Sequence, residues 1–273
     1  AQVAAAAAAA VAAQAQATAV AVAAVQSLLA QVERDHGLLQ LLVSILVDTM
    51  AAAKQAAAAV GGAAAAAPGG GLGVESMLAE FFASLFFVLQ RGGAEVQLAW
   101  DDVARLWRAL GGAAEGAALG PGWTSLREIC LANLGTLIEG TMALSTVRRL
   151  FTEELCAVPP PEVTAQTYLC FQKALVRVAV LEKKMVLAVP RAGGPPVYVV
   201  TALDLTGLES LWRYALDCPA NDVAHASIKL LMEVQRAPQL PESGRREARE
   251  NFLTHCLAVL GTSADQLAAA GGG

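Results

Sequence analysis

The sequence is poor in charged and aromatic residues. Of its 273 residues only 16% are charged and 5% aromatic, and residues 1–32 carry no charge at all. The net charge of −5 provides no basic field to hold nucleic acid or an anionic lipid surface. The hydrophobic fraction is 56%, but alanine supplies much of it and buries little area per residue. We therefore expect a thin hydrophobic core and no nucleic-acid partner.

Cysteine and histidine lack the spacings that metal or disulfide chemistry requires. The cysteines stand at positions 130, 156, 170, 218 and 256, and the histidines at 36, 225 and 255. No CxxC, HxxxH or HExxH pattern occurs, so the sequence does not support a metal site. Without a signal peptide or paired spacing, the cysteines indicate reduced, buried thiols. We predict no metal, no cofactor and a cytoplasmic location, with the nucleus as an alternative.

The uncharged N-terminal segment raises the question of a membrane helix. It lacks the basic start and leucine-rich stretch of a signal peptide and the arginines of a transit peptide. The stronger apolar run, residues 38–47, is too short to span a bilayer. We predict a soluble helix over residues 19–32, after a low-complexity segment for which disorder stays open. The chain begins with Ala1 and not with methionine, so we expect a piece of a longer protein.

Two helices folded back on each other are predicted over residues 204–234. Thr206 with Glu209 three residues later has the spacing of a capping box and starts the first helix. A proline ends that helix, and Asn221 or Asp222 caps the second. Two amphipathic helices joined by a short loop form an antiparallel hairpin.

Apolar residues recur at helical spacing along both helices of this predicted hairpin. The inward positions are Leu208, Leu211, Trp212, Ala215 and Leu216 in the first helix and Val223, Ser227, Leu230, Leu231 and Val234 in the second. We interpret Trp212 as a core anchor between the two helices; a contact residue at the surface is the alternative. Such a hairpin cannot bury both faces alone and needs a neighbour on each side, which is typical of stacked helical repeats.

The same stretch, DLTGLESLWRYALDCPANDVAHASIKLLMEV, resembles a hairpin of the very large ubiquitin-specific proteases of the fat-facets type. The shared pattern is acidic-Leu-x-Gly-Leu-x-x-Leu-Trp followed by Asp-Val-Ala-x-x-Ala-Ile-x-Leu-Leu. Flanking residues 198–201 and 251–256 also resemble that family, and the similarity spans about residues 151–260, about two fifths of the chain. The resemblance implies an armadillo- or HEAT-like helical segment that lies outside the protease domain.

Apolar spacing and caps predict further helices along the chain. They cover residues 38–57, 75–90, 100–110, a helix that starts with a Ser125–Glu128 capping box, 142–156, 163–183 and 247–260. Residues 75–90 are the most apolar and are expected at the centre of the stack, with a phenylalanine-lined binding groove as the alternative. Residues 185–201 have β-branched residues around a Gly-Gly-Pro-Pro turn; we favour an extended loop over a hairpin.

Together these signals predict an all-α chain, an armadillo/HEAT-like α-solenoid of antiparallel helix pairs with Gly/Ala-rich loops. The predicted segments are a low-complexity segment 1–18, N-terminal helical repeats 19–110 with a linker at 61–73, a Gly/Ala-rich connector 111–122, C-terminal helical repeats 123–261 and a tail 262–273.

A catalytic centre is not predicted in this chain. The family's nucleophilic cysteine follows an Asn-Leu-Gly-Asn-Thr type of turn, with a distant histidine as base. Residues 133–135 read Asn-Leu-Gly, but Thr-Leu-Ile follows, and Cys130 precedes the motif. His255 and Cys256 are adjacent on a helix and point about 100° apart. We interpret the match as chance, and the carboxylate pairs 101–102 and 153–154 as solvated charge.

The resemblance implies a parent protein that is a cysteine-type deubiquitinase, a thiol protease of the ubiquitin conjugation pathway. This segment would be its non-catalytic scaffold, which positions substrate or partner proteins. A stand-alone armadillo/HEAT-type adaptor without a protease is the alternative, and a small helical enzyme that uses Cys or His is a third. The expected partners are protein substrates or adaptors, with or without attached ubiquitin, and not nucleic acid, membrane or a small molecule.

Overall fold

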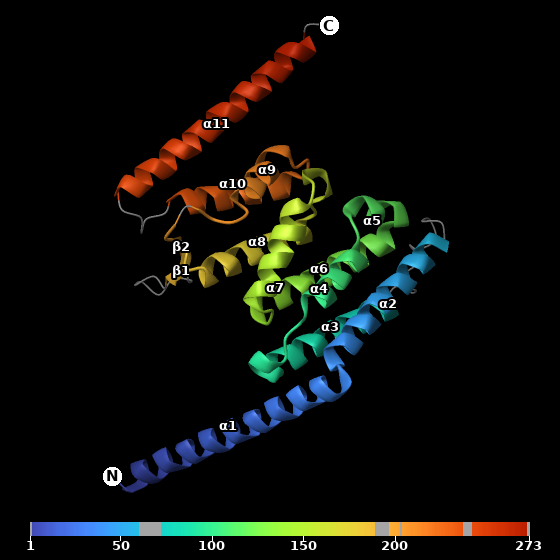
Figure 1. The fold of residues 1–273 in the computed structure, drawn as a ribbon, viewed down its shortest axis with the longest axis vertical. Coiled ribbons are helices and arrows are strands. Elements are labelled where there is room, and N and C mark those ends of the chain that lie inside the picture. Colours follow the sequence, from blue (N-terminus) through green and yellow to red (C-terminus); the bar gives the residue numbers. More distant parts are fainter. Residues whose placement is uncertain (1, 60–71, 189–196, 203, 237–241, 272–273) are drawn as a thin grey trace. The chain divides into compact units, whose positions relative to one another are not determined.

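Helices make up most of the computed structural model, which describes residues 2–59, 72–188, 197–202, 204–236 and 242–271 (Figure 1). The α-helices are α1 (Gln2–His36), α2 (Leu38–Ala59), α3 (Leu72–Gly92), α4 (Trp100–Leu110), α5 (Ala113–Leu119), α6 (Pro121–Gly140), α7 (Leu144–Arg149), α8 (Ala165–Leu181), α9 (Leu208–Asp217), α10 (Asn221–Arg236) and α11 (Glu242–Gly271). The prediction of a mostly helical chain is confirmed. The chain divides into two compact units, residues 1–158 with 164–174, and residues 159–163 with 175–273.

Helix α3 lies at the centre of the first unit, against α1, α2 and α6. Its buried residues Leu78, Phe82, Leu85 and Leu89 recur every three or four positions and form one apolar stripe. The helix is therefore buried along one face against three other helices, and the prediction that it is covered on several sides is confirmed only in part. Phe87, by contrast, is 53% exposed, so the aromatic residues of α3 divide between the core and the surface.

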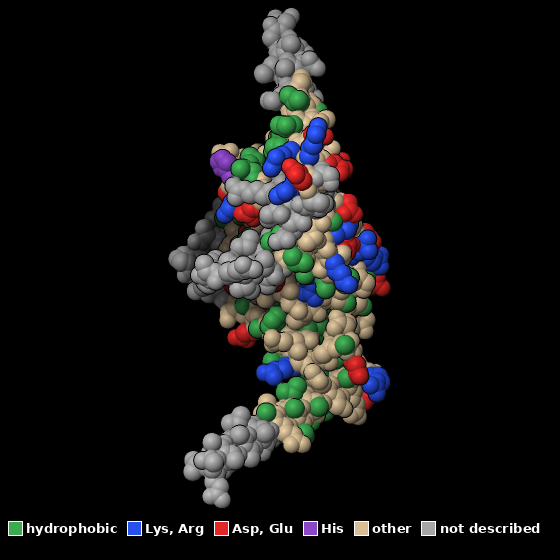
Figure 2. Space-filling model, turned by 90° about the vertical axis from the view of Figure 1, so that its left-hand side faces the viewer, with side chains coloured by type: hydrophobic (Ala, Val, Ile, Leu, Met, Phe, Trp, Pro, Cys, Tyr) green, Lys and Arg blue, Asp and Glu red, His purple; other side chains and the backbone are tan. Residues whose placement is uncertain are grey.

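Helix α1 differs from the prediction at its start, because the alanine-rich segment continues the helix back to Gln2. Alanine has the highest helix propensity, which outweighs the low complexity of the segment. Residues 14–28 expose the side chains that the structure describes, including Val20 and Leu28. In the lower part of Figure 2, where this helix lies, hydrophobic and other uncharged groups predominate.

Two helices among the described residues are long and apolar enough to cross a membrane, by length and composition alone. They are residues 14–36 of α1 and all of α2. Alanines extend the short apolar run at residues 38–47 into a helix of 22 residues. However, α2 buries Leu39, Val43, Leu46 and Met50 inside the first unit, and a core helix passes the same test. The absence of a membrane partner stays a prediction.

The structure of residues 111–128 differs from the predicted connector and capping box. Residues 113–119 are helical as α5, and α6 begins at Pro121, four residues before Ser125. Proline suits the first turn of a helix because its missing N–H has no partner there in any case. The predicted Ser125 cap is therefore wrong, since Ser125 lies inside the helix. The predicted linker at 61–73 falls largely on residues 60–71, outside the described part of the chain.

The segment predicted as one helix over 142–156 changes its winding. Helix α7 passes into a π-helical turn, η2 (Leu150–Glu154), and then into a 3₁₀ turn, η3 (Leu155–Ala157). Leu150 and Phe151 of the π-helical turn are completely buried, and the Phe151 ring lies 5.2 Å from that of Phe171 in α8. Buried aromatic packing of this kind stabilises an otherwise rare winding.

In the second unit, α9 and α10 form the predicted hairpin, in which the two helices lie side by side (Figure 1). Every inward position predicted for α10 is buried. Two predictions for α9 are wrong. Leu216 is 46% exposed, and the helix starts at Leu208 after Gly207, without a side-chain cap from Thr206. Gly207 has a φ of 84°, a conformation that glycine adopts without strain.

Two further expectations for the second unit are corrected. Residues 185–201 contain a real two-stranded sheet, in which β1 (Met185–Ala188) pairs antiparallel with β2 (Val197–Val200). Lys184 holds the base of this hairpin through contacts of 2.9 Å with the Asp204 carboxylate and 2.7 Å with its carbonyl oxygen. The predicted fading tail is instead helical, because α11 runs on to Gly271. The turn predicted between the strands falls on residues 189–196, outside the described residues.

Candidate functional site

Cys130 and Cys170, two of the three cysteines of the first unit, lie in surroundings that suppress their reactivity, while the third, Cys156, is only partly buried. Burial raises the pKa of the Cys130 thiol to about 12, and burial likewise raises the pKa of Cys170 to about 12. The Cys170 thiol also donates a hydrogen bond of 3.1 Å to the Leu131 carbonyl. Because the thiolate is the nucleophile, thiols that stay protonated are poor catalysts. These positions fit the prediction of buried, reduced thiols.

The Asn-Leu-Gly stretch, residues 133–135, lies within α6 and not in a turn. The Asn133 amide donates 2.8 Å to the carbonyl of Ile129, one turn earlier in the same helix, and Leu134 is completely buried. A Cβ added at Gly135 would lie 3.5 Å from the Cys170 sulfur, an ordinary van der Waals contact, so Gly135 faces α8 within the packed helices. The local role of these residues is helix packing.

The histidines belong to separate helices. His36 ends α1 and His225 is exposed on α10, while His255 is partly buried on α11. The ring of His255 lies against Trp212, at 4.3 Å between ring centroids. Within the described residues, no group of three or more His, Cys, Asp or Glu side chains is placed to hold a metal ion.

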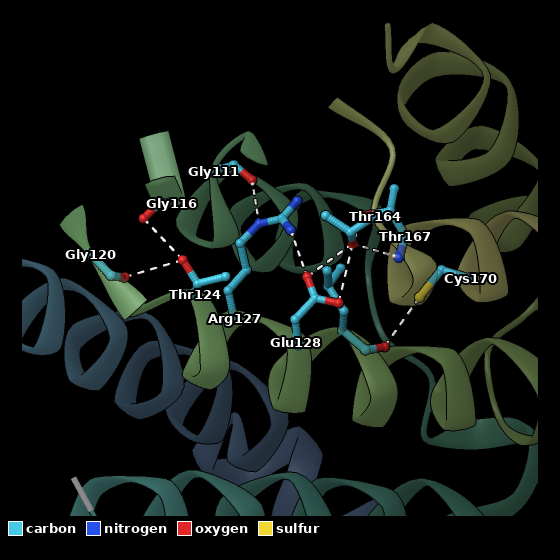
Figure 3. A network of polar contacts seen from close by, with 10 residues as sticks. Gly111, Gly116, Gly120, Thr124, Arg127, Glu128, Thr164, Thr167 and Cys170 are labelled. Atoms are coloured by element: carbon cyan, nitrogen blue, oxygen red, sulfur yellow. Dashed lines mark hydrogen bonds and ion pairs between the residues drawn. The ribbon is translucent and has the colours of Figure 1, made fainter. Parts of the chain in front are cut away.

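A chain of polar contacts joins α6 to the first turn of α8 within the first unit (Figure 3). Arg127 is buried, and its guanidinium donates 3.0 Å to the neighbouring Glu128 carboxylate and 3.1 Å to the Gly111 carbonyl. The Thr164 hydroxyl donates 2.9 Å to the same carboxylate and accepts 3.3 Å from the Thr167 amide. Thr164 therefore caps α8 while it binds Glu128.

This network positions helices and offers no obvious reactive group. The Glu128 carboxylate already receives a guanidinium and a hydroxyl, which balance its charge and fill acceptor positions. Glu128, predicted as part of a capping box, instead links elements that are 36 residues apart. The network was not predicted from the sequence, because the local pattern Ser-Leu-Arg-Glu fits a helix cap as well as a buried ion pair.

A basic groove lies between α2 and α4, also within the first unit. It has a volume of about 310 Å³. The residues that line it are Val47, Ala51 and Lys54 of α2 and Arg105, Arg108 and Ala109 of α4. We call this feature the α2–α4 groove. Its floor is small and apolar, while its charged side chains are all cationic, so it can bind an anionic group.

The three cations of the α2–α4 groove are held to different degrees. Arg105 donates 3.1 Å to the Ser44 hydroxyl and lies 3.5 Å from the Asp102 carboxylate, which is 13% exposed. Lys54 lies 2.8 Å from the Glu115 carboxylate. Arg108 is exposed, donates 3.1 Å to the Ala104 carbonyl, and forms no ion pair among the described residues. Arg108 is therefore the cation most available to a ligand.

The carboxylate pairs predicted as solvated charge are only partly so. Asp102 is mostly buried, and burial raises the pKa of its carboxyl group despite the opposing effect of Arg105. Glu153 lies at the surface, where a hydrogen bond of 2.9 Å from Arg149 lowers the pKa of its carboxyl group. Asp101 and Glu153 are exposed and fit the expectation, whereas Asp102 and Glu154 are only partly exposed.

A larger groove of about 520 Å³ lies between α1 and the turn that follows α3. Its charged lining residues are Arg34, Asp35 and Glu95, which include both signs of charge. Two carboxylates and one guanidinium give this lining a net charge of −1, which does not favour an anion. The α2–α4 groove is smaller but has a defined chemical character.

The aromatic residue singled out by sequence, Trp212, lies at the contact of α9 with α11. Its ring is 5.2 Å from that of Phe252 and 4.3 Å from that of His255. The residue is partly buried, while the neighbouring Leu211 and Tyr214 form the buried face of α9. The aromatic contacts of Trp212 therefore join α9 to α11, and its role as an anchor between α9 and α10 stays a prediction.

No protein-family model matches the sequence of this chain, and no curated protein matches it. The family assignment accordingly rests on the residue pattern of 204–234 alone and is taken up below as a proposal.

Proposed function

We propose that this chain is a non-catalytic, armadillo/HEAT-like helical scaffold of a cysteine-type deubiquitinase. In that role it positions protein substrates or partners beside a catalytic domain located elsewhere in the parent protein. The proposal combines the sequence resemblance of residues 204–234 with the way in which the helices of that region are stacked.

The packing of α9 is the observation that supports the proposal most directly. One face of α9 packs on α10, while Trp212 on another face contacts Phe252 and His255 of α11. Each helix therefore serves as a surface for the next, which is how helical repeats bury faces that a single hairpin leaves open. Exposed Ile228 and Met232 on α10 offer apolar area of the kind that a further repeat or a partner covers.

The state of the thiols supports a non-catalytic role. Cys130, which lies closest to the Asn-Leu-Gly stretch, is completely buried within α6, and its pKa is raised to about 12. A thiol protease requires the opposite, an accessible cysteine whose pKa is lowered by a histidine or a helix N-terminus.

Activity measurements and the longer reading frame test the proposal together. The purified chain should not release fluorophore from ubiquitin that carries a C-terminal fluorogenic amide. The parent reading frame should encode the two catalytic motifs of a thiol protease, one around the nucleophilic cysteine (the cysteine box) and one around the histidine base (the histidine box). Deletion of α9–α11 from the parent should leave hydrolysis of the fluorogenic substrate unchanged but slow the removal of ubiquitin from a protein substrate.

Two results would contradict the proposal in different ways. Hydrolysis by the isolated chain that a single Cys→Ala change abolishes would make it an enzyme. A complete reading frame without both boxes would make it a stand-alone helical adaptor.

A further inference from the structure

The α2–α4 groove concentrates positive charge in a chain whose net charge is −5. Among the described residues that line it, Lys54, Arg105 and Arg108 are charged and none is acidic. A groove with one sign of charge and low-dielectric walls attracts the opposite sign more strongly than scattered surface charges do.

We propose that the α2–α4 groove binds an acidic peptide segment of a partner protein through its side-chain carboxylate or phosphate groups. Guanidinium groups bind both kinds of oxyanion through paired N–H donors. The apolar floor of Val47, Ala51 and Ala109 can contact the short aliphatic stems that carry such anions. This inference rests on the proposed scaffold function, to which it adds a partner chemistry.

The arrangement of the cations favours this ligand. Arg105 is held in place by Ser44 and Asp102, so its orientation is set before a ligand arrives, while exposed Arg108 is available to change its rotamer. Lys54 already binds a carboxylate, that of Glu115, at 2.8 Å. The groove therefore contains one internal example of the contact that we propose for a partner.

The dimensions of the groove suit a short extended segment better than a single ion. On α2 the lining runs from Val47 to Lys54, which at the rise of a helix is about 10 Å. About three residues of an extended peptide cover that distance, and their alternating side chains would place anions on one side. Nearby Asp102 and Glu115 weaken the positive field, so we expect binding that is sensitive to salt.

Fluorescence anisotropy with labelled peptides tests this proposal on the full chain. The probes are a glutamate-containing peptide, a phosphoserine-containing peptide and a glutamine-containing neutral peptide, all of the same length. We expect saturable binding of at least one anionic probe and none of the neutral one. Comparison of the two anionic probes distinguishes carboxylate from phosphate as the preferred group.

Matched arginine variants locate the site. Arg108→Gln should weaken binding by about fivefold, the effect of one solvent-exposed ion pair, and Arg108→Glu should weaken it further. Arg91→Gln, at another exposed arginine in the last turn of α3, changes the net charge by the same amount and should have no effect. A photo-crosslinker in the middle of the peptide should label residues 44–54 or 102–109.

Equal loss of binding in the Arg91 and Arg108 variants would overturn the proposal, because it would indicate attraction to net charge alone. Crosslinks confined to other helices, or tighter binding to anionic lipid vesicles than to either peptide, would also overturn it. These outcomes do not depend on the deubiquitinase proposal. A parent reading frame without the catalytic cysteine and histidine motifs would contradict that proposal but would leave a measured peptide site valid.

Discussion

The Trp212 ring of α9 lies against the His255 ring of α11, with the ring centroids 4.3 Å apart and the ring planes tilted by 35°. The Trp212 ring also contacts Phe252 of α11, so Trp212 joins α11 to the α9–α10 hairpin. The aromatic residue therefore extends the stack to a third helix.

Trp212→Ala should detach α11 more than it disturbs α9 and α10. Trp212 is partly buried, so the expected loss of unfolding free energy is about 2 kcal/mol, below the 3–5 kcal/mol typical of a fully buried tryptophan. Hydrogen exchange around residues 252–255 should become faster in the variant. Leu216→Ala on the same helix is the control, because Leu216 is 46% exposed. Unchanged exchange in α11 after the tryptophan change would refute the contact.

Glu128→Gln should destabilise the first unit. It removes the carboxylate that pairs with Arg127, whose side chain is only 4% exposed, and leaves a buried guanidinium without its counter-charge. Because Glu128 itself is 27% exposed, we expect a loss of about 2–3 kcal/mol in urea denaturation. The control is Glu153→Gln, at the surface pair with Arg149, which should have little effect. Similar losses in both variants would show that the buried network has no special role.

Because Cys130 is buried as a neutral thiol, we expect the free energy of unfolding to fall at alkaline pH. The folded-state pKa of Cys130 is raised from its ordinary value of 9.0 to about 12, so the folded state keeps the neutral thiol when the unfolded chain ionises. The stabilisation from this group is complete below about pH 9 and decreases as pH rises towards 12. Cys130→Ala should flatten this part of the stability curve, measured by urea denaturation at several pH values. A curve with unchanged slope in that variant would contradict the burial of Cys130.

Alkylation of the folded chain near pH 8 gives a second, independent readout of the same feature. Iodoacetamide should modify the partly buried Cys256 before Cys130 or Cys170, which should react only after denaturant is added. Mass spectrometry of the digested protein measures the order. Early labelling of Cys130 in the folded chain is the result that would be inconsistent with the structure.

The sequence and the structure differ on whether Thr206 or Gly207 matters for the start of α9. The sequence pattern assigns a capping role to Thr206, whereas the structure gives Gly207 the special backbone conformation. Gly207→Ala should destabilise the second unit by about 1–2 kcal/mol, because its φ of 84° is unfavourable for a residue with a Cβ atom. Thr206→Ala should change stability little, since no side-chain cap is formed at the start of α9. Thermal unfolding of the two variants measures the difference. A larger loss of stability in Thr206→Ala than in Gly207→Ala would indicate that Thr206 does cap α9.

The helices that carry strong apolar spacing were predictable from the sequence alone. The predicted bounds of α4 agree with the structure, and the inward residues of α10 are buried as expected. The spacing of apolar residues every three or four positions depends only on the local geometry of a helix, so no knowledge of its neighbours is needed. The ends of α6 and α9 were harder to predict, because the same residues can serve as caps or as helix interior.

The candidate groove could not be found in this way. Lys54 and Arg105 stand 51 positions apart, and nothing in their local sequence indicates that α2 and α4 pack together. The short sheet was also missed, because two strands of four residues carry little local signal, and the contact of Lys184 with Asp204 beside the sheet joins residues 20 positions apart. Both features depend on contacts between residues distant in sequence.

For this chain, the order of residues determined that it is helical, where most helices run and which faces turn inward, since these follow from backbone geometry and the burial of apolar area. Which helices meet, and hence where Trp212, Glu128 and the groove arginines place their side chains, was decided only in three dimensions, because each of those contacts joins segments that the sequence keeps far apart.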